Sequence, residues 1–165
     1  REFLAVADLL SDTGRKVVVM GGRLTHAHGD YFATLLRVIR ADVSFIADML
    51  TDWQQALLDM RAGDVAVIFD IRRYDAQMLE FAASAQERGV QIVLITDQWI
   101  SPIARLAVHS LPLRIEAPSS WDSNIVPLFV AEALIAATVN SNWPKTQGRI
   151  RTLEAIASRN GRKGK

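Results

Sequence analysis

The 165-residue sequence lacks cysteine entirely and has only three histidines, five prolines and 7% aromatic residues. Without cysteine the chain has no disulfide, no thiolate metal site and no cysteine nucleophile, which is compatible with a reducing compartment. No apolar run approaches the roughly 20 residues that a membrane-spanning helix needs. The opening residues, "REFLAVADLL", carry acids and no small-residue cleavage site, so they do not resemble a signal peptide. We therefore expect a cytoplasmic protein with no membrane partner.

The chain also lacks an excess of either charge, because its formal net charge is only +1. From Lys145 onward there are seven basic residues against one acid, Glu154, which gives this tail +6 and leaves about −5 for the rest. A mildly acidic body does not favour nucleic-acid binding, and a short basic tail alone is weak evidence for it. The length predicts one domain with a sizeable core.

Short apolar runs alternate with longer segments of helical period. Three of the runs are nearly continuous β-branched and aliphatic residues, the pattern of strands covered on both faces. The predicted strands span residues 16–20, 43–46, 65–69, 91–96 and 111–115. The predicted helices span residues 25–40, 75–88, 102–108 and 122–140, with a turn or two in 52–60. This alternation predicts a doubly wound α/β fold, a three-layer structure around a mostly parallel sheet.

Ligands of such sheets bind at the carboxyl ends of the strands, so the segments that follow the strands are the ones to inspect. These segments are "GGRLTHAHGD", "DIRRYD", "DQWISP" and "APSSWDSN". The third segment is better explained as the start of a helix than as a ligand site, since Ser101 and Pro102 fit an N-cap followed by proline at N1.

The first segment places Gly21, Gly22 and Thr25 where a strand turns into a helix. The glycines allow close approach of the backbone to a ligand, and the threonine can cap the helix and face an anion. The spacing matches neither the dinucleotide fingerprint nor a P-loop, so no nucleotide cofactor is predicted. A tight turn with a threonine N-cap is the simpler alternative.

The second segment places Arg72, Arg73 and Tyr74 between two aspartates. Arginine side chains match phosphate or carboxylate oxygens bidentately, which favours an anion site. The alternative is that these arginines pair with Asp70 and Asp75 and neutralise the loop. The residues alone support both interpretations.

Other polar residues carry weaker signals. His26 and Asp30 share a helix face at i, i+4, but His28 does not, and two ligands without a third do not predict a metal site. Ser119 and Ser123 precede the last apolar helix, where hydroxyl residues are common caps. No Ser-His-Asp arrangement with a nucleophile elbow is present, so the residues predict no catalytic site.

The helix predicted at 122–140 contains "IVPLFVAEALIAATV", which is apolar around most of its circumference. Such a helix is either buried within its domain or placed at a subunit interface. We expect a homodimer or a higher homo-oligomer.

Three stretches carry a resemblance to a known family: "VVMGGRLTHAHGDYFATLLRVI", "GDVAVIFDIRRYDAQMLEFAASAQERGVQIVLITDQWISPIARLA" and "SSWDSNIVPLFVAEALIAATV". Over residues 15–140 the sequence resembles the sugar-isomerase (SIS) domain of RpiR-type bacterial transcriptional regulators. Its most specific parts are the GGR-x-T turn, the RRY triplet and the "ITD-x-x-x-SP-x-A-x-LA" pattern.

The resemblance implies a flavodoxin-like sheet of five parallel strands that dimerises and recognises a phosphosugar or related carbohydrate effector. Residues 1–14 then form a helix that ends a linker, 15–145 form the SIS domain, and 146–165 form a C-terminal helix and basic tail. DNA is a partner only through a helix-turn-helix domain outside this chain. The implied ligand-binding residues are Gly21, Gly22, Arg23, Thr25, Asp70, Arg72, Arg73, Tyr74, Ser119 and Ser123.

The sequence departs from the family at the phosphate loop. SIS domains that bind a sugar phosphate usually carry S-x-S-G-x-T after the third strand, and here the matching positions are Asp70, Arg72, Arg73 and Asp75. Either arginine holds the phosphate, or the ligand is not a phosphosugar. A sensing domain rather than an enzyme is expected. The alternatives are a sugar-phosphate isomerase with Glu132 or His26 as its base, and a degenerate domain that only dimerises.

Overall fold

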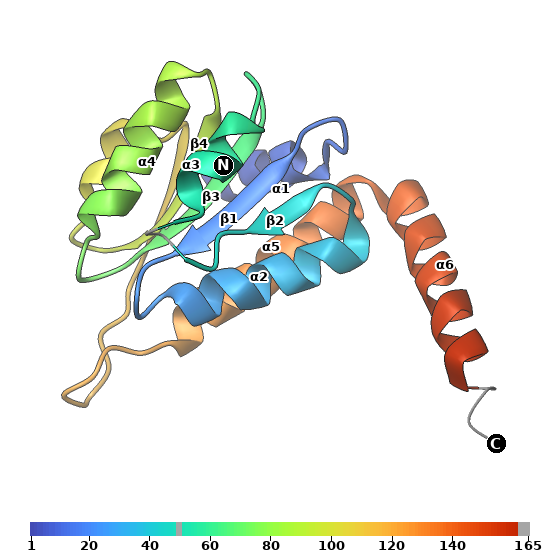
Figure 1. Cartoon of the computed structure of the whole chain (residues 1–165). Helices are drawn as coiled ribbons and strands as arrows, with labels where there is room; N and C mark the ends of the chain where they lie inside the picture. Colours follow the sequence, from blue (N-terminus) through green and yellow to red (C-terminus); the bar gives the residue numbers. More distant parts are fainter. Residues whose placement is uncertain (49–50, 162–165) are drawn as a thin grey trace.

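The computed structural model describes residues 1–48 and 51–161, which form a single sheet with helices on both sides (Figure 1). The strands are β1 (Val17–Gly21), β2 (Val43–Phe45), β3 (Val65–Asp70), β4 (Gln91–Asp97) and β5 (His109–Leu113). The helices are α1 (Glu2–Ser11), α2 (His26–Ile39), α3 (Trp53–Leu58), α4 (Ala76–Glu87), the 3-10 turn η1 (Pro102–Arg105), α5 (Ile125–Ser141) and α6 (Trp143–Gly161).

All neighbouring strands are parallel, and their order is β2-β1-β3-β4-β5. This is the flavodoxin-like order, in which the chain reverses direction across the sheet between β1 and β3. The predicted five-stranded, doubly wound α/β fold is therefore confirmed.

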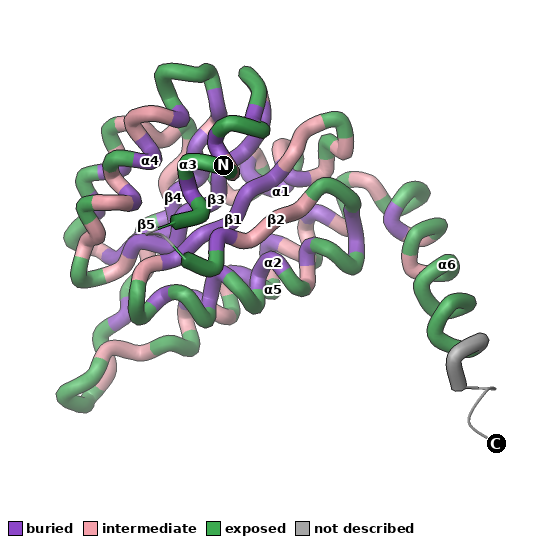
Figure 2. Tube along the Cα trace, in the orientation of Figure 1, coloured by how far each residue is buried: buried purple, intermediate pink, exposed green. Residues whose placement is uncertain are grey.

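The strands are covered on both faces because successive side chains point to opposite sides. Val17, Val19 and Phe69 belong to a core shared with α1, α2 and α5. Val18 and Ile68 belong to the opposite core, shared with α3, α4 and η1. Figure 2 shows the result, a buried sheet beneath largely exposed outer helix faces. Continuous apolar runs in the sequence correspond to strands with no exposed face.

The predicted boundaries were wrong at β5 and α5. The fifth strand was expected over 111–115 but begins two residues earlier, at His109, because this edge strand opens with polar residues that break the apolar run. It also contains Pro112, which an edge strand tolerates. The helix expected from residue 122 begins at Ile125, so residues 114–124 form a long loop.

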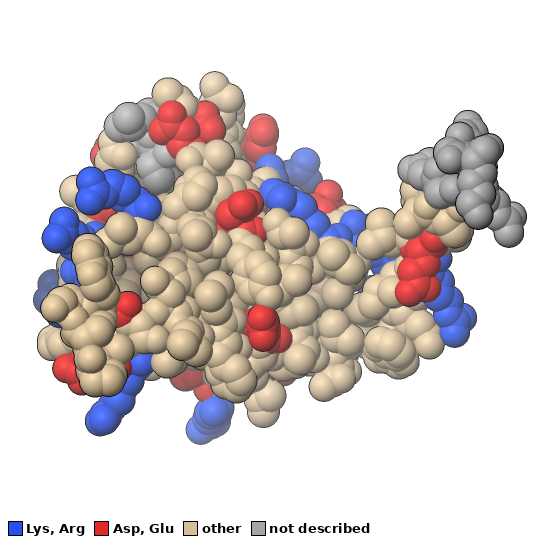
Figure 3. All heavy atoms as spheres, turned by 90° about the horizontal axis from the view of Figure 1, so that it is seen from below, with Lys and Arg blue, Asp and Glu red and all other residues tan. Residues whose placement is uncertain are grey.

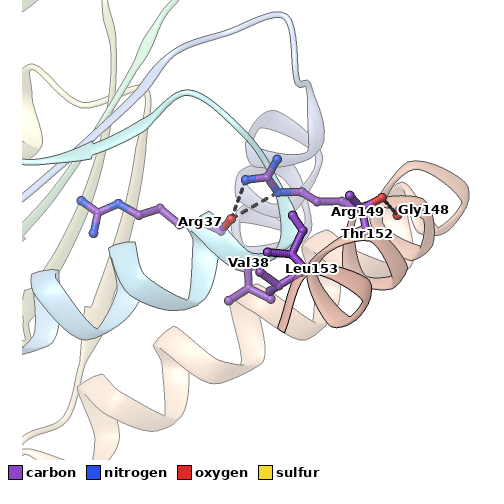
Figure 4. Close-up of a pocket in the computed structure, with 7 residues that line it drawn as sticks. Arg37, Val38, Gly148, Arg149, Thr152 and Leu153 are labelled. Carbon is purple, nitrogen blue, oxygen red and sulfur yellow. Dashed lines mark hydrogen bonds between the residues drawn. The ribbon is translucent and has the colours of Figure 1, made fainter. Parts of the chain in front are cut away.

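Helix α6 leaves the body of the molecule at a bend of 108° from α5 (Figure 1). Near its base the Arg149 guanidinium donates from Nε and Nη2 to the carbonyl oxygen of Arg37, at 3.2 and 2.9 Å. Figure 4 shows this contact beside a groove of about 320 Å³ that Val38 and Leu153 help to line. Residues 162–165 of the predicted tail lie outside the described part of the chain. Among the described residues, no single helix is both long and apolar enough to cross a membrane.

The turn from β1 into α2 depends on close packing at Gly21. A β-carbon there would lie 2.3 Å from the carbonyl oxygen of Thr25, which is far inside van der Waals contact. This glycine therefore serves the packing of the turn, and the neighbouring Gly22 is the one that borders a cavity.

We predict that Gly21→Ala lowers the free energy of unfolding by about 1–3 kcal/mol, because the turn must open to admit the methyl group. Urea denaturation measures the change. Gly148→Ala is the control, because the corresponding position in α6 has no atom within 4 Å and should lose no stability. An unchanged midpoint for the Gly21 variant would contradict the packing argument.

Candidate functional site

The carboxyl ends of β3 and β4 place two buried aspartates close together. Asp70 is the last residue of β3 and Asp97 the last of β4, and in the register Asp70 lies opposite Thr96. Both carboxyls are essentially inaccessible to solvent. Buried carboxylates need hydrogen-bond partners, and those partners determine the shape of the surrounding loops.

The Asp97 carboxylate accepts three hydrogen bonds. Its Oδ2 accepts from the backbone N–H of Arg72 at 2.5 Å, and its Oδ1 accepts from the backbone N–H of Trp99 at 2.9 Å. The Tyr74 hydroxyl also donates to Oδ1, at 2.8 Å. Burial, together with this bond, raises the pKa of the Tyr74 phenol, so the hydroxyl remains a donor. One side chain thus connects the loops after β3 and β4.

Two residues next to these bonds adopt strained backbone conformations. Arg72 has φ = 69° and Ile100 has φ = 64°, a left-handed region that residues with a β-carbon rarely enter. For a β-branched isoleucine this conformation is a real outlier. Such strain persists only where surrounding contacts enforce it, and it tends to cluster at ligand sites. Here the enforcing contacts include the bonds of Asp97.

The side chain of Arg72 is already occupied. Its Nε donates to Asp122 at 2.8 Å, and its guanidinium carbon lies 4.1 Å from the centre of the Trp99 ring. The alternative that the arginines pair with Asp70 and Asp75 is therefore wrong for this residue. No residue near Arg72 in the sequence indicates its true partner, Asp122, which lies 50 positions further along the chain.

Asp70 and Asp75 instead serve the loop and the helix after it. Asp70 accepts a hydrogen bond from the Ser101 hydroxyl and a long one, 3.4 Å, from the backbone N–H of Asp75. Burial raises the pKa of the Asp70 carboxyl, and these hydrogen bonds oppose the shift. Asp75 caps α4, because its carboxylate accepts from the backbone N–H of Gln77 at 2.9 Å.

Thr25 occupies the predicted N-cap position of α2, but its side chain does not cap that helix. Its hydroxyl donates to the carbonyl oxygen of Phe69 at 2.6 Å and accepts from the backbone N–H of Gly22 at 2.8 Å. The threonine therefore ties the turn after β1 to the end of β3. The expectation that it caps α2 was wrong, because the hydroxyl oxygen accepts from Gly22 in the preceding turn and its proton goes to the neighbouring strand β3.

Two adjoining cavities lie at this edge. The first, which we call the arginine cavity, has a volume of about 340 Å³ and lies between the turn after β1 and the loop after β3. Its lining residues are Gly22, Arg23, Leu24, Thr25, Asp70, Ile71, Arg73, Tyr74, Asp75 and Ala76. Within the described part of the chain, the side chains of Arg23 and Arg73 make no hydrogen bond or ion pair.

The second, which we call the Trp121 cavity, has a volume of about 240 Å³. It lies between α2, the loop before α5 and the first turn of that helix, and its lining includes Arg72, Trp121 and Ser123. His28 also lines it, and the buried Nδ1 of this histidine has no hydrogen-bond partner among the described residues. Burial lowers the pKa of His28, so its imidazole is neutral at pH 7.

Most of the expected ligand-binding residues come together in these cavities. Gly22, Arg23, Thr25, Asp70, Arg73 and Tyr74 line the arginine cavity, and Arg72 and Ser123 line the Trp121 cavity. Gly21 and Ser119 line neither. The Ser119 hydroxyl instead stabilises its own turn through the backbone of Trp121, at 2.7 and 3.0 Å.

The residues considered for metal binding or catalysis are spread apart. His28 is buried, whereas His26 and Asp30 are exposed on the outside of α2. Glu132 accepts a hydrogen bond from Tyr31 on the outer surface of α2 and α5, at 2.7 Å, and borders neither cavity. Over the described residues, no three potential metal ligands come together.

Comparison with known proteins relates this geometry to a family. The family model described as "SIS domain" matches residues 9–137, which is most of the chain. No curated protein matches the sequence significantly.

Solved structures share the fold at low sequence identity. The RpiR transcription factor of Sphaerobacter thermophilus (sugar isomerase domain) has a TM-score of 0.84 and 20% identity, over 93% of this chain and 86% of that one. Vibrio vulnificus NanR complexed with ManNAc-6P has 0.76 and 18%, over 94% and 60%. A Methanococcus jannaschii protein with an inferred 3-hexulose-6-phosphate isomerase function has 0.72 and 14%, over 92% and 82%.

We predict that Asp97→Ala lowers the free energy of unfolding by about 3 kcal/mol, because three partly buried donors lose their one acceptor together. Tyr74→Phe removes only one of these bonds and should cost about 1 kcal/mol. Urea denaturation of the two variants compares the losses. Equal losses would mean that the main-chain donors of Arg72 and Trp99 do not depend on the carboxylate.

Proposed function

The chain belongs to the SIS-domain family, and from this we propose that it is the effector-sensing, dimerising domain of a transcriptional regulator. Its effector is a phosphosugar or a related carbohydrate metabolite. A DNA-binding domain outside this chain, joined through α1, carries the DNA contact. The likeness to the RpiR and NanR structures supports this assignment at the level of the fold.

The observation that carries the proposal is the pair of adjoining cavities at the carboxyl edge of the sheet. Open α/β sheets bind small molecules at this edge. The two volumes, about 340 and 240 Å³, suit a ligand of monosaccharide size. Both cavities are lined by charged and hydroxyl side chains that can exchange hydrogen bonds with a polyol.

Sensing fits this site better than catalysis. Aldose–ketose isomerisation requires a base that reaches a carbon of the bound sugar. Glu132 and His26 border neither cavity, so neither is placed for that role. His28 is the observation that favours an isomerase as the second candidate, because its neutral imidazole lines the Trp121 cavity. Conversion of a bound sugar to its isomer would show that the domain is an isomerase rather than a sensor.

Dimerisation is proposed through the outer face of α2 and α5. Ile125 and Phe129 are 76% and 67% exposed, one helical turn apart on α5, and Tyr31 of α2 lies on the same side. Figure 3 views this side of the molecule and shows a broad area with few charged side chains. Exposed apolar area of this kind marks an interaction surface, and a second copy of the chain is the partner we assign to it.

We predict that the thermal midpoint rises with one class in a panel of sugar phosphates, sugar acids and free sugars. At a concentration about 100-fold above Kd, the expected shift is about 5–10 °C. Differential scanning fluorimetry gives the shifts, and product analysis of the same mixtures tests for turnover. If no compound in a broad panel shifts the midpoint, sensing is contradicted and a domain that only dimerises is favoured.

A second prediction concerns the interface. Phe129→Glu should convert a dimer into a monomer in size-exclusion chromatography with light scattering, because it places a charge within the buried face. Leu58→Glu is the matched control, since Leu58 is 73% exposed on α3, across the sheet. A monomeric wild-type chain, or dissociation by both variants alike, would contradict the proposed surface.

A further inference from the structure

The hydrogen-bond donors around the arginine cavity are mostly used within the protein. The Thr25 hydroxyl donates to Phe69, and the Tyr74 hydroxyl donates to Asp97. The backbone N–H of Gly22 donates to Thr25. Among the described side chains that line this cavity, the guanidinium groups of Arg23 and Arg73 are therefore the charged donors left without a partner.

The positive end of α4 is also unavailable. A helix N-terminus attracts anions because its first N–H groups lack partners. Here Asp75 supplies that negative charge from within the chain, and its carboxylate accepts from Gln77 at 2.9 Å. Asp75 itself lines the cavity. A ligand anion at the helix end would meet this carboxylate and be repelled.

Arg72 is excluded from the same role. It borders the Trp121 cavity rather than the arginine cavity, and its guanidinium is held by Asp122 and by the ring of Trp99. Two adjacent arginines therefore differ in their contacts: Arg72 links loops within the protein, and the guanidinium of Arg73 has no partner in the part of the chain that the structure describes.

We propose that Arg23 and Arg73 together bind the oxyanion of a carbohydrate ligand in the arginine cavity. This inference rests on the proposed sensing function and assigns the anion subsite within it. Guanidinium groups bind carboxylate and phosphate oxygens alike, so the shared chemistry is that of a sugar oxyanion. Asp75 lines the same cavity, and its carboxylate can accept hydrogen bonds from sugar hydroxyls.

The arginine cavity is lined by both positive and negative side chains, so the assignment can be tested by changes that should alter anion affinity in opposite directions. Removing a guanidinium should weaken anion binding, whereas removing the negative charge of Asp75 should strengthen it. Asparagine suits this second change, because it caps a helix about as well as aspartate and so preserves the start of α4.

Isothermal titration calorimetry tests the inference with the anionic sugar that gives the greatest thermal shift in the panel. Arg23→Ala and Arg73→Ala should each weaken its affinity at least about tenfold, the usual effect of losing a charged hydrogen bond. Asp75→Asn should tighten it several-fold. Arg88→Ala, at the far end of α4, is the matched control and should leave affinity unchanged.

The probes also separate the two sources of an oxyanion. Comparing a sugar phosphate with a sugar acid of the same ring shows which anion the arginines prefer. The corresponding neutral sugar shows whether binding needs an anion at all. Equal affinity for the neutral sugar, or unchanged affinity in both arginine variants, overturns the arginine assignment and leaves sensing intact. If no sugar binds the wild-type chain, the proposed function fails and this inference falls with it.

Discussion

The geometry of the candidate site depends on one buried carboxylate, that of Asp97. It accepts hydrogen bonds from the backbone of Arg72, the backbone of Trp99 and the hydroxyl of Tyr74. These donors belong to loops that follow two neighbouring strands. A carboxylate this deeply buried is stable only with its partners in place, so the loops and the aspartate stabilise one another.

The consequence extends to a third loop. With its backbone held by Asp97 at φ = 69°, Arg72 directs its guanidinium over Trp99 and onto Asp122. The loop before α5 is thereby attached to the end of β3. The ion pair is partly exposed and contributes little stability by itself, so its role is to define where the loop lies. The turn after β1, the loop after β3 and the loop before α5 form the walls of the two cavities.

The sequence predicted the strands and the site's position in the fold, because continuous apolar runs identify buried strands and parallel strands end at a common edge. It failed where tertiary contacts decide. Nothing local distinguishes Arg72, which is bound to a residue 50 positions away, from Arg73, whose guanidinium has no partner among the described residues. In the sequence Asp97 is only the last residue of a strand. Its role in holding the loops depends on three donors that folding brings to it. The Thr25 hydroxyl similarly prefers a neighbouring strand to its own helix.

The loop of residues 114–124 connects the Trp121 cavity to helix α5. It forms one wall of the Trp121 cavity, and it leads directly into α5, whose outer face carries Ile125 and Phe129. The proposed small-molecule site and the proposed self-association surface thus share one short covalent segment, through which each could alter the other. Linkage is reciprocal, so any change in self-association caused by a bound ligand must be matched by an equal change in ligand affinity on self-association. A domain that coupled the two in this way would report occupancy as a shift in an assembly equilibrium.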